Sequence, residues 1–104
     1  MKLSDTLTGE KREFAPASDV VKIYVCGVTP YSASHVGHAM SYIVFDVLHR
    51  YLEYAGYKVR RVQNFTDIDD KLIDRANLEG TTVKELAKRL IGEYFSDMSA
   101  LNVR

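Results

Sequence analysis

The sequence has little of several residue types that mark specialised classes of protein. Its 104 residues include one cysteine, two prolines and no tryptophan, and 14 Lys and Arg residues balance 14 Asp and Glu residues. A single cysteine excludes an internal disulfide framework. Zero net charge argues against a polybasic tail that binds DNA or a membrane surface. No apolar run approaches the roughly 20 residues of a membrane helix, and the first ten residues lack the apolar core of a signal peptide. We therefore expect a soluble, cytoplasmic protein.

The composition that remains is that of one globular α/β domain. Hydrophobic residues make up 46% of the chain and aromatic residues 11%, which is enough to form a packed core. Residues 20–26 are mostly β-branched or aromatic and predict a buried strand. Apolar residues at helical spacing predict a following helix, with Ser34 as N-cap and Gly56 as C-cap. Its expected core face comprises Val36, Met40, Ile43, Val44, Val47, Leu48, Tyr51 and Leu52.

Residues 57–63 alternate between polar and apolar side chains and predict a second strand, parallel to the first. The basic residues in it, Lys58, Arg60 and Arg61, are interpreted as its solvated face. Residues 20–63 then form a βαβ unit, and residues 1–19 form an arm or an edge hairpin before it.

Residues 64–104 are predicted to be helical. Thr66 or Asp67 is expected to cap a helix that begins near Ile68, and Thr82 with Glu85 forms a capping box for a further helix. The carboxylates of Asp67, Asp69 and Asp70 suit either a magnesium ion or the positive end of that first helix.

The residues richest in chemistry lie between the first strand and the helix. His35 and His38 are three residues apart, so both imidazoles lie on one face of the first helical turn. Free backbone N–H groups at a helix start attract phosphate, and Gly37 leaves room for a ligand against the backbone. The imidazoles then donate hydrogen bonds to the α-phosphate of a nucleotide triphosphate during an in-line displacement. The alternative is a pair of surface histidines without a ligand.

Four blocks in order resemble the N-terminal catalytic half of the cysteinyl-tRNA synthetases. They are Tyr24–Tyr31, His35–His38, Phe45–Leu52 and Val62–Lys71. The resemblance implies an incomplete Rossmann-like parallel sheet with flanking helices, as in the class I synthetases of the nucleotidyltransferase superfamily. It also implies ATP with Mg²⁺, L-cysteine and tRNA(Cys) as substrates.

The same resemblance implies roles for individual residues. His35 and His38 are the catalytic pair, and the ATP-binding set is His35, Gly37, His38 and Ser41. The residues that contact cysteine or its adenylate are Gly27, Thr29, Asn64 and Thr66. Cys26 matches one ligand of a zinc ion that binds the substrate thiol, with the other ligands expected downstream.

Other functions fit the same blocks. The related ligases that join cysteine to glucosaminyl-inositol in mycothiol synthesis share most of them. A catalytically silent domain that self-associates through an open sheet edge is a further alternative.

Overall fold

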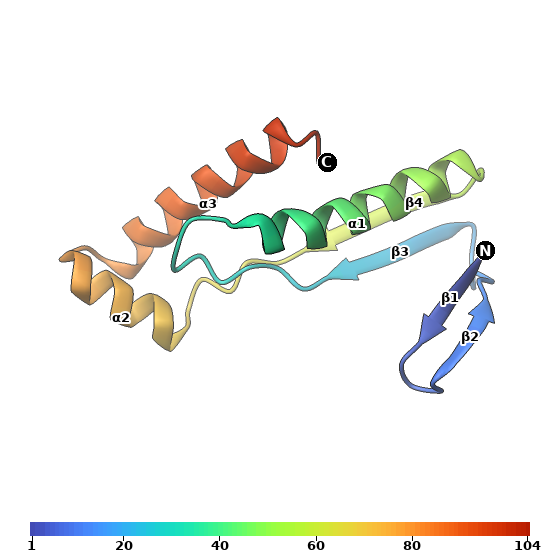
Figure 1. The fold of residues 1–104 in the computed structure, drawn as a ribbon, viewed down its shortest axis with the longest axis horizontal. Helices are drawn as coiled ribbons and strands as arrows, with labels where there is room; N and C mark the ends of the chain where they lie inside the picture. The colour runs from blue at the N-terminus through green and yellow to red at the C-terminus, as the bar shows by residue number, and fades with distance from the viewer.

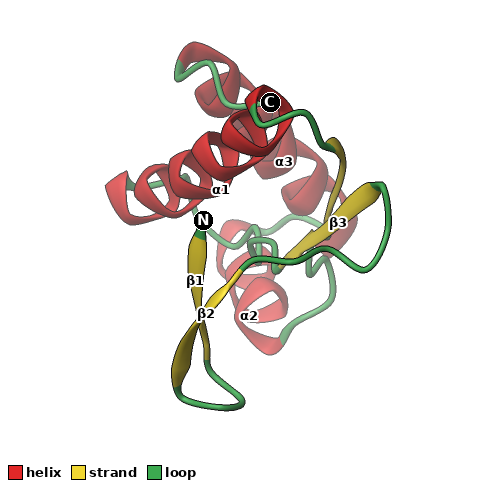
Figure 2. Ribbon diagram, turned by 90° about the vertical axis from the view of Figure 1, so that its right-hand side faces the viewer, coloured by secondary structure: helices red, strands yellow, loops and turns green.

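The computed structural model describes residues 1–104 as an elongated molecule of 50 × 31 × 23 Å. A hairpin of β1 (Lys2–Asp5) and β2 (Glu10–Glu13) projects at one end, and α2 (Asp70–Glu79) and α3 (Val83–Ala100) lie toward the other (Figure 1, Figure 2). Between them, α1 (Val36–Tyr54) lies along β3 (Val20–Val25) and β4 (Lys58–Gln63). No helix has the length and apolar character needed to cross a bilayer.

The central unit is β3–α1–β4, and its two strands are parallel as predicted. Val20 pairs with Lys58 and Val25 pairs with Gln63 at the two ends of the ladder. Val21 and Val25 are buried, which agrees with the period of two along a strand covered on one face. The N-terminal hairpin forms a separate antiparallel sheet, so it is not an edge of the parallel sheet.

The expected core face of α1 is wrong for most of its residues. Val36 is 85% exposed, and of the eight residues expected inside only Leu52 is buried. The side chains that α1 buries include Tyr42 and Asp46, which lie on the opposite side of the helix. Because α1 is apolar on two sides, its periodicity did not distinguish the side that packs against the strands and α3.

The ends of α1 also differ from the prediction by one residue. His35, not Ser34, is the N-cap, and its side chain accepts a hydrogen bond from the backbone N–H of Gly37. Ala55 is the C-cap, and Gly56 follows it with φ of 91°. Only glycine adopts this left-handed conformation without a steric cost.

Helix α2 begins later than expected. Its N-cap is Asp69, in place of Thr66 or Asp67, and Ile68 lies outside the helix and is 79% exposed. A carboxylate that accepts a hydrogen bond from Lys71 N explains this start better than the apolar pattern did. The capping box of α3, between Thr82 and Glu85, is present as predicted.

Two apolar clusters hold these elements together. One joins β3, the loop after it, α1 and α3 through Val25, Val28, Tyr42, Tyr94 and Met98. The other joins α2 to α3 through Leu72, Ala76, Leu86, Ala87 and Leu90. The first cluster fixes the start of α1 relative to the end of β3, which is the region expected to carry the site.

An ionic cluster around Asp46 fixes the other half of α1. The Asp46 carboxylate accepts hydrogen bonds from Arg50 Nε at 2.6 Å and from the backbone N of Arg104 at 3.0 Å. Arg61 lies 3.8 Å away. Burial acts to raise the pKa of Asp46, but the hydrogen bonds from Arg50 and Arg104 and the charges of Arg50 and Arg61 outweigh it, so the pKa is lowered. Asp46 thus links α1, β4 and the segment after α3.

Replacing Asp46 with Asn should lower the free energy of unfolding by about 1–3 kcal/mol, because Arg50 and Arg61 lose their shared carboxylate in a largely buried place. Chemical denaturation monitored by circular dichroism measures the change. Asp74→Asn, at an exposed position of α2, is the control and should change the value by less than about 0.5 kcal/mol. Equal stability of the two variants would show that the cluster is not stabilising.

Candidate functional site

The ends of β3 and β4 stay together beyond the last ladder pair. Gly27 N donates to Asn64 Oδ1 at 2.8 Å, and Thr66 N donates to Val28 O at 3.1 Å. A Cβ atom at Gly27 would lie 1.4 Å from the backbone oxygen of Asn64. Only glycine therefore permits this approach. Three of the predicted cysteine-binding residues, Gly27, Asn64 and Thr66, thus meet at the carboxyl end of the strands, where open α/β sheets bind ligands.

The remaining predicted residues of this edge come from the loop between β3 and α1. Cys26 directly follows β3 and its side chain is exposed. Thr29 is half-buried, and its carbonyl accepts from Tyr31 N at 2.9 Å in a tight turn. The pKa of Tyr42 is raised by burial, then by Tyr94 and by Cys26.

His35 and His38 stack against each other at the start of α1. Their ring centroids are 3.9 Å apart and the ring planes differ by 16°. His35 Nδ1 accepts from Gly37 N at 3.1 Å, and His38 Nδ1 accepts from His35 N at 3.3 Å. These two bonds form a capping box built from histidines in place of the usual hydroxyl and carboxylate.

The capping bonds determine which ring nitrogens carry the protons. A neutral imidazole whose Nδ1 accepts a hydrogen bond has its proton on Nε2. Both rings therefore present an Nε2–H donor that has no partner within the protein. Burial lowers the pKa of His38 below 6.5, and the neighbouring His35 lowers it further. The lowered pKa favours the neutral form of His38, which accepts the capping bond at Nδ1 and leaves an Nε2–H donor.

Gly37 and Ser41 lie on the same helix as the pair. A Cβ atom at Gly37 would approach the His35 ring to 3.0 Å, so the glycine also gives the ring room to fold back over the first turn. Ser41 is exposed one turn later. A hollow of about 350 Å³ lies between the start of α1, including Ser34 and His35, and the end of α3.

One contact at this edge was not anticipated. The Lys71 ammonium group lies 5.6 Å from the centroid of the Tyr31 ring, a cation–π distance. It links the loop before α1 to the first turn of α2. Both residues stood in the blocks that resemble the synthetases, but nothing in their spacing predicted that they would meet.

The donors in residues 1–104 do not form a metal site by themselves. No group of three or more His, Cys, Asp or Glu side chains is arranged to hold an ion. Cys26 has none of the further ligands that zinc needs, about three protein donors at an open site. Of the aspartates considered for magnesium, Asp69 caps α2 and Asp70 lies in its first turn, which favours the capping interpretation.

The fold is that of a class I aminoacyl-tRNA synthetase catalytic domain. Residues 13–104 match the family described as tRNA synthetases class I (C) catalytic domain, and the chain belongs to that family. It is 56% identical, over 99% of its length, to cysteine–tRNA ligases from two strains of Dehalococcoides mccartyi, BAV1 and 195. The chain spans 23% of the length of these relatives.

A solved structure shows the same arrangement. Methionyl-tRNA synthetase of Mycobacterium tuberculosis, in complex with methionyl-adenylate, superposes with a TM-score of 0.73 at 29% sequence identity. The match covers 80% of this chain and 17% of that one. The expected incomplete Rossmann-like sheet with flanking helices is therefore confirmed.

Substitutions at two glycines test the close contact between the ends of β3 and β4. Gly27→Ala should destabilise the protein by about 3 kcal/mol, because the added Cβ overlaps a backbone oxygen that cannot move without separating the strand ends. Gly92→Ala, where a Cβ meets nothing within 4 Å on α3, should stabilise it by about 0.5–1 kcal/mol. Thermal or urea unfolding distinguishes the two. A neutral Gly27→Ala would contradict the close approach.

The histidine pair predicts a pH dependence. Because the pKa of folded His38 is lowered, its capping contribution is fully present above about pH 6.5 and is lost as pH falls through the folded value. NMR titration of the imidazole protons should show His38 titrating below 6.5. His35→Asn keeps a capping acceptor but removes the ring, so it should raise the pKa of His38 part of the way back toward 6.5. Ser34→Ala should leave the pKa of His38 unchanged. A His38 pKa that is unchanged by His35→Asn would refute the coupling.

Proposed function

We propose that this chain is the part of a cysteine–tRNA ligase catalytic domain that binds ATP and cysteine. The proposed reaction joins cysteine to AMP and then transfers the cysteinyl group to tRNA(Cys), in the cytoplasm. The names of the relatives favour this assignment over the related ligase of mycothiol synthesis. Because the chain spans 23% of their length, we expect it alone to lack full aminoacylation activity.

The observation that carries the proposal is the stacked pair of histidines at the start of α1, whose Nδ1 atoms accept the capping bonds and whose Nε2 atoms have no partner in the protein. In the activation step, a carboxylate oxygen of cysteine attacks the α-phosphorus of ATP, and the bond to pyrophosphate breaks. Negative charge grows on the α-phosphate oxygens in this displacement. Preoriented N–H donors at a helix start stabilise that charge without a covalent step on the protein.

His35 and His38 are therefore the proposed catalytic residues. Gly37 and Ser41, on the same helix, complete the proposed ATP-binding set, and Mg²⁺ accompanies the nucleotide. Stacking restricts both rings to one orientation, so little side-chain entropy is lost when the phosphate binds.

The meeting point of the strand ends is the proposed cysteine subsite. Gly27, Thr29, Asn64 and Thr66 lie around it, and Cys26 has an exposed thiol beside it. Cysteine differs from serine by one atom, and a pocket without a metal separates such isosteres only about 10- to 200-fold. Zinc prefers sulfur, and Cys26 would supply one ligand to it. The other donors are not among residues 1–104, so we assign zinc no step in the reaction.

Calorimetric titration with MgATP tests the role of the histidines. The double variant His35→Asn, His38→Asn keeps acceptors for the capping bonds but removes both Nε2–H donors. We expect its affinity for MgATP to fall at least about tenfold, because a hydrogen bond to a charged group contributes about 1.5–3 kcal/mol. His49→Gln, in the middle of α1, is the control and should bind as the unmodified chain does. Equal affinity of all three proteins would favour the catalytically silent alternative.

A further inference from the structure

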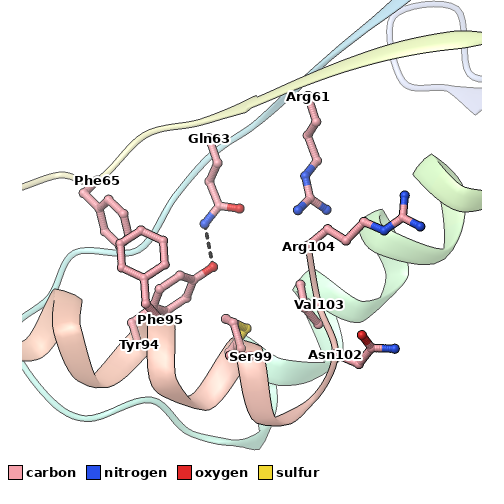
Figure 3. Close-up of a pocket in the computed structure, with 10 residues that line it drawn as sticks. Arg61, Gln63, Phe65, Tyr94, Phe95, Ser99, Asn102, Val103 and Arg104 are labelled. Atoms are coloured by element: carbon pink, nitrogen blue, oxygen red, sulfur yellow. Dashed lines mark hydrogen bonds between the residues drawn. The ribbon is translucent and has the colours of Figure 1, made fainter.

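A cavity of about 420 Å³ lies between β4, α3 and the segment after α3, and it contains neither histidine of the pair. Its volume falls in the range of small-molecule sites. Figure 3 shows the side chains of Arg61 and Gln63 pointing from β4 toward α3, with aromatic rings at one side and Arg104 at the other.

The aromatic wall of this cavity is held by contacts between its rings and by one hydrogen bond. Phe65 contacts Tyr94 and Phe95 edge to face, with centroids 5.2 and 5.6 Å apart. The Tyr94 hydroxyl accepts a hydrogen bond from Gln63 Nε2 at 2.7 Å. Phe95 is 58% exposed although it lines the cavity. The wall therefore offers an apolar aromatic surface on which a planar ring can stack.

Opposite the rings, the guanidinium group of Arg61 lacks a close acceptor. Its side chain is 12% exposed, and its carboxylate partner, Asp46, lies 3.8 Å away. Asp46 is already bound by Arg50 Nε at 2.6 Å and by a backbone N–H at 3.0 Å. No hydrogen bond of the protein satisfies Arg61, and its planar group points into the cavity (Figure 3). A largely buried guanidinium with unused donors favours a bidentate anion.

We propose that this cavity binds a small aromatic anion, with the ring against Phe65, Tyr94 and Phe95 and the carboxylate or phosphate on Arg61. The ring and the charge are both required, since each wall supplies one half of the recognition. None of the residues that line the cavity belongs to the proposed ATP and cysteine subsites, so the proposal does not depend on their assignment.

The probe is phenyl phosphate, titrated into the full chain and followed by ¹H–¹⁵N NMR, with benzoate as the carboxylate arm. We expect saturable shifts at the side chains of Arg61 and Gln63 for at least one of the two. Arg61→Met keeps the aliphatic stem and should weaken binding about tenfold or more. Arg60→Met is the matched control, because the neighbouring side chain is exposed on the opposite face of β4. Equal affinity of the two variants, or no saturable shift with either probe, would overturn the proposal.

The ring half of the site has its own test, which also covers the case that Arg61→Met does not fold. Phe95→Ala removes an exposed ring and should weaken phenyl phosphate several-fold, whereas Leu78→Ala, 82% exposed on α2, should not. Inorganic phosphate and phenol should each bind more weakly than phenyl phosphate. Phosphate as tight as phenyl phosphate would refute the role of the rings. The double variant His35→Asn, His38→Asn should bind phenyl phosphate with unchanged affinity. A loss of affinity in that variant would show that the probe binds at the histidines and not in this cavity.

Discussion

The hydrogen bond from Gly27 N to Asn64 Oδ1 fixes the geometry on which the candidate site depends. Beyond the last ladder pair the two chains are joined by this bond and by a backbone bond from Thr66 N to Val28 O. Here a side-chain acceptor replaces the missing backbone acceptor, and the absence of a Cβ at Gly27 lets the two chains touch. Cys26 and Thr66 are thereby held at one edge of the parallel sheet. Any residue larger than glycine would open this edge.

One arrangement of hydrogen bonds lets the histidine pair cap α1 and, in the proposed function, present donors to a phosphate. Capping uses Nδ1 of both rings, and this use sets the tautomer that leaves Nε2–H free for a ligand. An aspartate cap would satisfy the helix equally well, but its carboxylate would present no hydrogen-bond donor to a phosphate. The cost is sensitivity to acid, since protonation of Nδ1 removes the capping acceptor. The lowered pKa of His38 moves that loss away from neutral pH.

Local sequence patterns were sufficient to predict an element of secondary structure where one physical effect determined it. The β-branched run of β3, the alternation of β4 and the capping box of Thr82 and Glu85 each specify one structure, and each was predicted correctly. The histidines could be placed at a helix start for the same reason. Roles for Gly27, Asn64 and Thr66 came from the resemblance alone. Their meeting depends on contacts between segments 37 residues apart in sequence, which no local pattern contains.

The errors arose where two effects competed. Helix α1 is apolar on two sides, and its burial is decided by the strands and α3, so periodicity chose the wrong side. At α2, Ile68 extended the apolar pattern, but the capping carboxylate of Asp69 set the start. Such conflicts between propensity and tertiary contact cannot be weighed from one segment at a time.

The burial of Arg61 was likewise not predictable from the charge composition of the chain. Neutral composition favoured a solvated face for Lys58, Arg60 and Arg61, and Lys58 and Arg60 are indeed exposed. The alternation of β4, however, turns Arg61 to the side that α1 covers. Burying a guanidinium costs free energy unless a carboxylate accompanies it, and Asp46 supplies that carboxylate while being shared with Arg50. Because one carboxylate cannot satisfy the donors of both arginines, the cavity beside Arg61 retains hydrogen-bonding capacity that the folded chain does not use.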